Sequence, residues 1–174
     1  ISINDHEVSI SSPNSARKNG IGMVFQHFSL FPALTVAENI LIALDKKIKF
    51  KDLISEISKL SKEWELFVDP LKRVSELSVG EQQRVEIIRC LMQNPKLLIM
   101  DEPTSVLTPQ EIANLFKILK RLASSGCAIL YISHKLEEII ELADQVTILK
   151  SGKSIATIDA KKTNTKFLAE TMVG

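Results

Sequence analysis

The sequence predicts an α/β fold, in which helices alternate with the strands of a mostly parallel sheet and an all-helical segment is inserted into that core. Two observations support the prediction. From residue 97 to residue 143, short apolar runs alternate with segments of helical periodicity, which is typical of parallel strands joined by helical crossovers. Between residues 35 and 67, apolar residues recur at helical spacing and no strand pattern interrupts them.

The amino-terminal part of the chain predicts short strands at residues 1–3 and 7–10, followed by a longer one at residues 21–25. This longer strand follows the turn signal Lys18-Asn19-Gly20 and ends at Gln26. Two amphipathic helices come next, in a segment that we place at about residues 33–76, inserted into the α/β core. Their apolar faces carry Val36, Ile40, Leu41 and Leu44 in the first helix and Leu53, Ile57, Leu60 and Trp64 in the second.

The second half of the chain predicts helices and strands in turn. A helix follows Gly80 and stops before Pro95, because the residue before a proline disfavours helical geometry. An apolar strand at residues 97–100 leads to a helix with Pro109 near its first turn. The remaining elements are a strand at 127–132, a helix at 136–143, a hairpin formed by 145–149 and 153–158, and a closing helix at 166–173.

The composition fits one ordinary domain. The chain has 174 residues, of which 45% are apolar, and this allows a sizeable core. Its 22 basic and 21 acidic residues give a net charge of +1, so charge offers no case for nucleic-acid binding or for a basic membrane anchor. No run approaches the roughly 18–20 apolar residues that span a bilayer. Cys90 and Cys127 lie far apart, and we interpret them as two isolated buried thiols.

The strand at residues 97–100 ends in two adjacent carboxylates, Asp101 and Glu102. Moving an ionised carboxylate out of water is costly unless it is paired or lies near a cation. Two such groups at the carboxyl end of a buried strand suggest a site for a metal ion and phosphate, since α/β sheets bind ligands at that edge. The alternative is an ordinary exit from strand to loop, in which Asp101 caps the loop and Glu102 faces solvent.

Three further motifs accompany this pair. Gln26 ends the strand at 21–25, the run Leu77-Ser78-Val79-Gly80-Glu81-Gln82 opens a helix, and His134 follows the strand at 127–132. Together with residues 97–102, these motifs resemble those of the nucleotide-binding subunit of the ATP-binding cassette (ABC) transporter family. The resemblance spans nearly the whole chain. It implies that residues 1–174 form a partial nucleotide-binding domain with a P-loop NTPase-like core.

The resemblance implies that the chain binds ATP and magnesium, and that Glu102, His134 and Gln26 are catalytic. Asp101 would hold magnesium through water, in the Walker B position, and Gln26 would offer the ion an amide oxygen. Glu102 would orient the attacking water or accept its proton. His134 would bond to the terminal phosphate and respond to its loss. A solvated glutamine and a helix-capping histidine are the ordinary alternatives for Gln26 and His134.

Ser78, Gly80 and Glu81 lie in the run that resembles the family's signature motif. A hydroxyl, backbone amides and the positive end of a helix can together bind anionic oxygens, although a serine can also simply cap the helix. In the family this motif faces the nucleotide of the opposite cassette, so two cassettes complete two sites. Val79 and Glu81 depart from the motif's usual glycine and glutamine, and Thr108 replaces an aspartate that many cassettes carry.

No Gly-x-x-x-x-Gly-Lys-Ser/Thr phosphate loop occurs among the six glycines, although the family carries one ahead of the glutamine motif. The chain also begins with Ile1. The resemblance therefore implies that the amino-terminal strands and the phosphate loop are missing, and that this chain alone is inactive as an ATPase. Residues 167–174 resemble the end of the first cassette in tandem-cassette importers of simple sugars and nucleosides.

This subgroup implies partners and a location. The expected partners are a second cassette, transmembrane permease subunits that contact the helical segment, and, indirectly, a substrate-binding protein; nucleic acid is not expected. The expected location is the cytoplasmic side of the plasma membrane, reached through the permease subunits. Two other functions stay open. One is a degenerate cassette that only docks or donates its signature motif, and the other is a soluble ABC ATPase that acts outside transport.

Overall fold

The computed structural model describes residues 1–3, 5–44 and 48–173. The chain forms two compact units, Ile1–Leu130 and Tyr131–Gly174. Residues 45–47, which belong to the predicted helical segment, fall outside the described residues. Each unit is considered by itself below.

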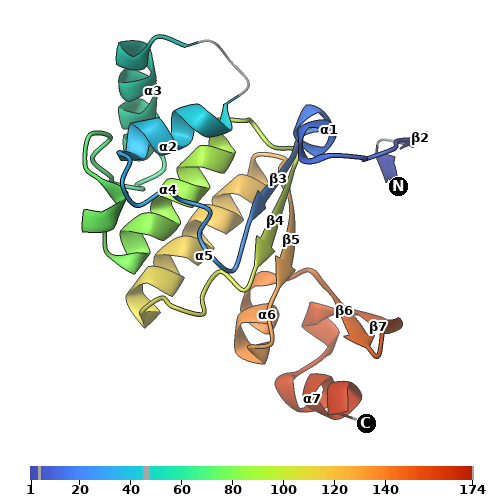
Figure 1. Ribbon diagram of the computed structural model, residues 1–174. Helices are drawn as coiled ribbons and strands as arrows, with labels where there is room; N and C mark the ends of the chain where they lie inside the picture. The colour runs from blue at the N-terminus through green and yellow to red at the C-terminus, as the bar shows by residue number, and fades with distance from the viewer. Residues whose placement is uncertain (4, 45–47, 174) are drawn as a thin grey trace. The chain divides into compact units, whose positions relative to one another are not determined.

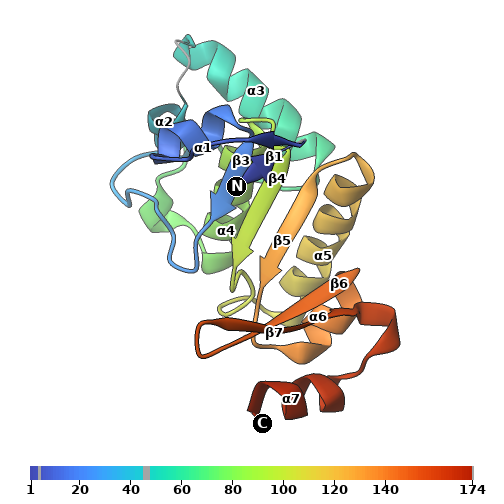
Figure 2. The same ribbon diagram turned by 90° about the vertical axis from the view of Figure 1, so that its right-hand side faces the viewer.

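The first unit is built on a three-stranded sheet. Strand β3 (Ile21–Val24) pairs in parallel with β4 (Leu97–Asp101). The next neighbour of β4 is β5 (Ala128–Ile132), of which residues 128–130 belong to this unit, so the order is β3-β4-β5. Figure 2 shows the three arrows running in the same direction. The register of β3 and β4, in which Val24 lies opposite Met100, confirms the parallel arrangement that the alternating pattern predicts.

Helices α2 (Val36–Ala43), α3 (Phe50–Glu63), α4 (Val79–Leu91) and α5 (Pro109–Ser124) lie on the same side of the sheet (Figure 1). Because side chains alternate between the two faces of a strand, one face of β3 and β4 points toward these helices. On that face Val24, Leu98 and Met100 are fully buried. The helices contribute buried apolar side chains to the same core: Val85, Ile88, Leu115, Phe116, Leu119 and Leu122.

The segment between β3 and α4 is helical. Helix α2 begins after Thr35, whose hydroxyl accepts the N–H of Glu38 while the Glu38 carboxylate accepts the N–H of Thr35. This capping box fixes the start of the helix. Leu53 and Ile57 on α3 are buried, as their spacing predicts. A short 3₁₀ helix, η1 (Val74–Glu76), precedes α4.

Arg121 of α5 is bonded to the end of α3. Its guanidinium lies 4.3 Å from the ring centroid of Trp64 and donates a hydrogen bond to the carbonyl of Glu63 at 2.5 Å. Both contacts lie at the carboxyl end of α3, where the helix dipole favours a cation. They join the helical segment to the helices that cover the sheet.

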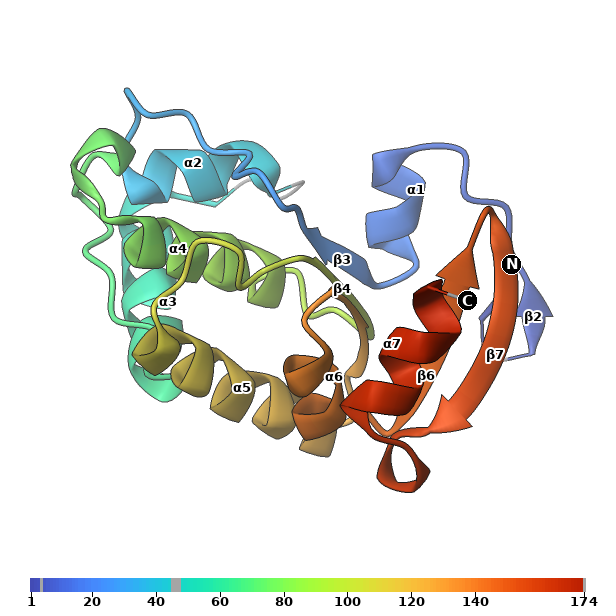
Figure 3. The same cartoon turned by 90° about the horizontal axis from the view of Figure 1, so that it is seen from below.

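The second unit consists of α6 (Leu136–Leu142), a hairpin of β6 (Gln145–Lys150) and β7 (Lys153–Asp159), a 3₁₀ helix, η2 (Ala160–Lys162), and α7 (Thr165–Val173). Ser151 and Gly152 connect the two strands with φ angles of 50° and 75°, the left-handed values that a type I′ turn requires. Ile139, Ile148 and Leu168 form the core of this unit. Figure 3 shows α7 beside β6.

Two local features differ from the sequence prediction. Strand β2 (His6–Glu7), which pairs with β1 (Ser2–Ile3), ends before the predicted strand at residues 7–10 does. Helix α1 (Pro13–Lys18) has no counterpart in the prediction. Its signal is local, because Ser12 caps the helix and Pro13 supplies the first helical position. The helix has 6 residues, too few to show a periodic apolar pattern.

The other predicted elements lie where their patterns place them, with boundaries that differ by up to three residues. Cys90 and Cys127 are free and buried, which confirms the prediction made for them. In the parts of the chain that the structure describes, no helix combines the length and the apolar character needed to cross a membrane.

Candidate functional site

Gln26 and Glu102 come together because of the register of the sheet. Val24 lies opposite Met100, and continuing the parallel register by two residues brings Gln26 level with Glu102. The two side chains meet there: Nε2 of Gln26 donates a hydrogen bond to Oε2 of Glu102 at 3.2 Å. The carboxyl ends of two neighbouring strands thus place both residues at the edge where α/β sheets bind ligands.

The chain turns sharply at Glu102, whose φ angle of 44° lies in the left-handed region. This conformation costs about 1–3 kcal/mol in a residue with a side chain, and such residues cluster at functional sites. A hydrogen bond from the N–H of Ser105 to the carbonyl of Glu102, at 3.3 Å, closes the turn. Asp101 and Glu102 are half-buried, while Pro103 and Thr104 are buried. The two residues after the carboxylates therefore anchor the turn.

Ser78 starts helix α4 with a capping box. Its hydroxyl accepts the N–H of Glu81 at 3.3 Å, and the Glu81 carboxylate accepts the N–H of Ser78 at 2.7 Å. Lys72 lies 3.4 Å from the same carboxylate. The N–H of Ser78, more than any other contact, holds the pKa of Glu81 below its ordinary value. Both side chains serve here as helix caps, and nucleotide binding by them stays a prediction.

Gly80 lies against the start of a second helix. Helix α5 follows Thr108, whose N–H and hydroxyl both donate to Oε2 of Glu111, at 3.0 and 2.8 Å. The other oxygen of this carboxylate comes so near to α4 that a Cβ on Gly80 would lie 1.6 Å from it. A side chain at position 80 would therefore have to displace the Glu111 carboxylate. The pKa of Glu111 is lowered, mainly by the N–H of Thr108, and Arg84 of α4 adds a smaller attraction.

A cleft of about 390 Å³ lies beside Gln26. Its walls come from the loop after β3, the start of α4 and the loop after β4, and they include Gln26, Phe28, Val79, Gln82 and Val106. The structure therefore brings the glutamine motif, the first turn of α4 and the loop that follows the two carboxylates to one surface.

His134 belongs to the second unit and lies, exposed, between β5 and α6. The hydroxyl of Ser133 accepts the N–H of Lys135 at 3.0 Å, and the phenol of Tyr131 donates to Glu138 at 2.7 Å. These bonds fix the turn that carries the histidine into α6. The approach of His134 to the residues of the first unit stays a prediction.

A magnesium ion would find oxygen ligands where β4 ends. Mg²⁺ is usually held by one or two carboxylates, and water and substrate phosphates complete its shell. The Asp101 carboxylate and the amide oxygen of Gln26 fit that description. Within residues 1–3, 5–44 and 48–173, no group of three or more His, Cys, Asp or Glu side chains could hold a metal ion. With these two oxygen donors, water and phosphate would supply the rest of the shell.

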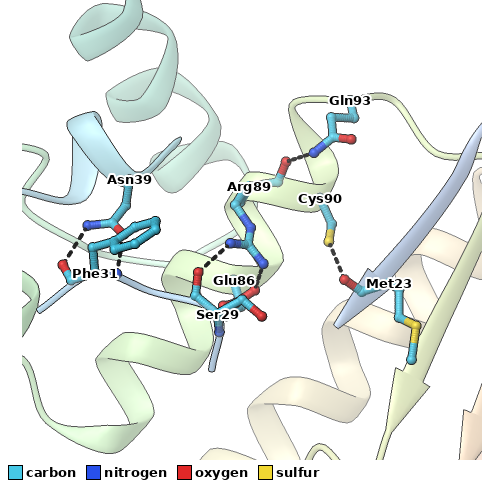
Figure 4. Close-up of polar contacts among 8 residues, drawn as sticks. All are labelled: Met23, Ser29, Phe31, Asn39, Glu86, Arg89, Cys90 and Gln93. Atoms are coloured by element: carbon cyan, nitrogen blue, oxygen red, sulfur yellow. Dashed lines mark hydrogen bonds and ion pairs between the residues drawn. The ribbon is translucent and has the colours of Figure 1, made fainter. Parts of the chain in front are cut away.

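The sequence prediction misses a buried polar network behind the loop that carries Gln26 (Figure 4). Glu86 and Arg89 of α4 form an ion pair, and both bond to the backbone of Ser29. Glu86 is fully buried, and burial raises its pKa, although Arg89 and the N–H of Ser29 oppose that shift. The signal in the sequence is a glutamate within the otherwise apolar run at residues 85–88.

Two further side chains fix the backbone around this network. Oδ1 of Asn39 accepts the N–H of Phe31 at 2.7 Å, and its Nδ2 donates to the carbonyl of the same residue at 3.1 Å. One buried side chain thus supplies partners that the loop backbone lacks. The thiol of Cys90 donates to the carbonyl of Met23 at 3.4 Å, and burial raises the pKa of this thiol to about 12.

Residues 1–105 match the family model described as ABC transporter. The chain is 44% identical to the nucleoside import ATP-binding protein NupA of Lactococcus lactis subsp. cremoris (strain MG1363), over 95% of this chain and 33% of that protein. It is 44% identical to the guanosine import ATP-binding protein NupO of Bacillus subtilis (strain 168), over 100% of this chain and 35% of that protein. The chain is 37% identical to the ribose import ATP-binding protein RbsA of Geobacillus kaustophilus (strain HTA426), over 100% of this chain and 36% of that protein. The chain spans about a third of the length of these curated relatives.

Solved structures share the fold. The cbiO1 protein of Clostridium perfringens, part of the ABC transporter complex cbiONQ, has a TM-score of 0.76 at 26% identity, over 99% of this chain and 68% of that chain. A dimeric ATP-binding cassette bound to ADP and Pi has a TM-score of 0.77 at 24% identity, over 92% of this chain and 73% of that chain. At this identity the likeness shows a shared fold and nothing more. Since the family model covers residues 1–105 of 174 and the fold agrees with it, the chain belongs to the ABC transporter family.

Proposed function

We propose that this chain is part of the ATP-binding and ATP-hydrolysing subunit of an ABC importer that powers the uptake of a sugar or a nucleoside. The hydrogen bond between Gln26 and Glu102 carries the proposal, because it joins two predicted catalytic residues from different strands. Membership of the family implies nucleotide binding. The proposed substrate class comes from the relatives, which import nucleosides, guanosine and ribose.

The proposed chemistry takes place where β3 and β4 end. Phosphoryl transfer is catalysed mainly by positioning and by charge stabilisation. Glu102 would orient the attacking water and accept its proton, and the amide of Gln26 holds that carboxylate in place. Asp101, through water, and the oxygen of Gln26 would hold magnesium, which neutralises phosphate charge when it is bound. His134 would donate a hydrogen bond to the terminal phosphate.

Ser78, Gly80 and Glu81 would contact the nucleotide of a second cassette. Two observations support this part of the proposal. The first turn of α4 borders the cleft beside Gln26, and the amino terminus of a helix attracts anions. The cassette would then complete its site only with a second one, either in tandem or as a dimer.

The helical segment would face the permease subunits. Large apolar side chains in and beside this segment stay in contact with solvent: Phe31, Phe67 and Leu71 are 57%, 64% and 58% exposed. Exposed apolar surface of this kind marks sites of protein interaction. A substrate-binding protein would take part indirectly, and the chain would lie on the cytoplasmic side of the plasma membrane.

We expect the 174-residue chain by itself to hydrolyse ATP negligibly. Its sequence contains no phosphate loop, and the lysine and backbone amides of that loop supply central contacts to the phosphates. Calorimetry should detect tight MgATP binding only after a phosphate-loop segment is added ahead of residue 1. Tight binding by the unextended chain would contradict this account of where the phosphates lie.

The direct test is a chimera of the Lactococcus lactis relative in which residues 1–174 of this chain replace the matching segment. The 44% identity over 95% of this chain supports such an exchange. Nucleoside uptake should return in cells that lack the native protein, and Glu102→Gln should abolish both uptake and ATP hydrolysis. A chimera that folds and assembles, but neither hydrolyses ATP nor restores uptake, would favour a docking module instead.

A further inference from the structure

Two side chains of α4 hold both backbone groups of Ser29 (Figure 4). Oε1 of Glu86 accepts the N–H of Ser29 at 2.8 Å, and Nη1 of Arg89 donates to its carbonyl at 3.0 Å. Oε2 of Glu86 pairs with Nη2 of Arg89. We refer to Ser29, Glu86 and Arg89 as the Ser29 clamp.

The charged side chains of the Ser29 clamp are buried: those of Glu86 and Arg89 are 1% and 12% exposed. The desolvation cost of a buried ion pair often exceeds the attraction within it, so such a pair is weak evidence for stability. A buried polar network whose members are satisfied instead specifies one arrangement of the chain around it. Here the chain around the network is the loop that follows β3.

This loop has few residues between its fixed points. Strand β3 ends at Val24, and Gln26 lies two residues beyond that end and three residues before Ser29. Three extended residues reach at most about 10 Å, so the clamp restricts where Gln26 can lie. Beyond the clamp, Asn39 holds both backbone groups of Phe31. The loop is therefore anchored before the glutamine by β3 and after it by the Ser29 clamp and Phe31.

We propose that Glu86 and Arg89 are positioning residues that hold the loop so that the amide of Gln26 reaches Glu102. They act through the backbone of Ser29. The inference rests on the proposed function for its catalytic consequence, because Glu102 is the proposed base. Glu86 also lies about two turns along α4 from Ser78 of the signature motif. A ligand that shifts this helix would therefore shift the loop as well.

The test follows the side-chain NH₂ resonances of Gln26 in ¹H–¹⁵N spectra of the chain, assigned through their loss in Gln26→Met. Arg89→Lys is the test variant, because lysine keeps the charge beside Glu86 but lacks the planar fork that donates to two partners. The Gln26 resonances should move toward those of a solvated glutamine. This variant removes the hydrogen bond to the Ser29 carbonyl and leaves Glu86 as the acceptor of the Ser29 N–H. The amide of Ser29 should still exchange with solvent roughly tenfold faster, because the loop is held by one hydrogen bond fewer and opens more often.

A second variant tests the same contacts in case Arg89→Lys does not fold. Glu86→Met combined with Arg89→Met removes both charges together and leaves no unpaired buried charge, and it should move the Gln26 resonances as well. Cys90→Ala is the matched control, since Cys90 occupies the next buried position of α4 but bonds to β3 and not to Ser29. The Gln26 resonances should stay in place in this control.

The inference is wrong if the Gln26 resonances stay in place in Arg89→Lys and in the double methionine variant while both remain folded. The same conclusion holds if amide exchange rises equally throughout the core and Gln26 does not respond. In the chimera, Arg89→Lys should lower kcat for ATP hydrolysis by up to about a hundredfold with little change in KM, because a misplaced group acts on the transition state. A chimera without any hydrolysis would reject the proposed function and leave the result on Gln26 intact.

Discussion

The amino termini of α4 and α5 are chemically alike but differ in their surroundings. Ser78 and Thr108 each accept the N–H of a glutamate three residues later, and Glu81 and Glu111 each accept the N–H of the capping residue. The carboxylate of Glu81 then pairs with a lysine, whereas that of Glu111 lies against Gly80 of the other helix.

A capping box therefore does not by itself identify a phosphate site. The pattern Ser/Thr-x-x-Glu predicts a helix start, and both helices follow it. The start of α4 differs from that of α5 in its position, because the first turn of α4 borders the cleft beside Gln26. Gly80 also has a role within the chain, since it admits the carboxylate of Glu111. A glycine at a helix start can thus serve packing as well as close approach to a ligand.

Gly80→Ala should have the largest effect on this pair of helix starts. The new Cβ would lie 1.6 Å from Oε1 of Glu111, the far end of a flexible side chain, so the carboxylate must move away and its capping contacts with Thr108 must weaken. The lost capping contacts and the crowding that remains should together cost about 1–3 kcal/mol in the free energy of unfolding. Urea unfolding followed by circular dichroism should show the loss as a lower midpoint.

A double-mutant cycle makes that result specific. Glu111→Ala alone should cost about 0.3–1.5 kcal/mol through loss of its capping contacts. In the Gly80→Ala background the same change should cost less, or even stabilise the protein, because it removes the clash. Strictly additive costs would mean that the two helices do not meet through this pair. Val79→Ala, in the same turn, controls for a general effect of alanine.

Loss of either cap should have an intermediate effect that is similar for the two helices. Ser78→Ala and Thr108→Ala should each lower the free energy of unfolding by about 0.5–2 kcal/mol. In the chimera, only Ser78→Ala should also raise the Kd for MgATP, because only α4 borders the cleft beside Gln26. An equal rise in Kd for both variants would remove the distinction between the two helix starts.

Lys72→Met tests the ion pair at the start of α4 and should have a smaller effect. The side chains of Lys72 and Glu81 are 34% and 26% exposed, and solvent screens such a pair, so the loss should be about 0.2–1 kcal/mol. Thermal unfolding at low and high salt should show the difference from the native chain shrinking as salt is added. A salt-independent difference would point to lost packing of the lysine stem.

The smallest effect should come from pH, and its sign differs between residues. A carboxylate whose pKa is lowered in the folded state stabilises the protein at pH values above its ordinary pKa. That contribution is lost as the pH falls through the folded pKa. Glu81 and Glu111 belong to this class, with an ordinary value of 4.5. Glu86 has a raised pKa, so its contribution is present below 4.5 and is lost as the pH rises through the folded pKa.

Melting temperatures between pH 3 and pH 7 would separate these contributions. Glu81→Gln and Glu111→Gln should each flatten the decline of Tm on the acid side by a small amount, since both side chains are only half-buried and solvent screens their charges. The two variants should behave alike, because the N–H of the capping residue, Ser78 in one helix and Thr108 in the other, is the main cause of each pKa shift. An acid profile that neither variant changes would show that the caps do not depend on charge.

Local patterns in the sequence predict most of the secondary structure. Leu53 and Ile57 mark the inner face of α3, and both are buried. The apolar run at residues 97–100 predicts β4, which extends one residue further. Helix α1 escapes prediction because 6 residues carry too few apolar positions to define a period. Its start depends on the hydroxyl of Ser12, and serine is also common in turns that start no helix.

Contacts between distant residues depend on tertiary packing. Gln26 and Glu102 are 76 residues apart, and the resemblance to a family places both in one site before the strand register explains why they meet. Glu86 and Ser29 are 57 residues apart, and neither a motif nor a periodicity relates them. The place of His134 depends on the second unit and stays a prediction.

The register between β3 and β4 also governs which insertions and deletions the site can tolerate. Because pairing between the strands sets Gln26 level with Glu102, residues added or removed in the helical segment between them leave that pairing unaltered. One residue added within β3 would change it, since side chains alternate along a strand and the glutamine would pass to the opposite face. Variation in length among related chains should therefore collect in the helical segment and avoid the two strands.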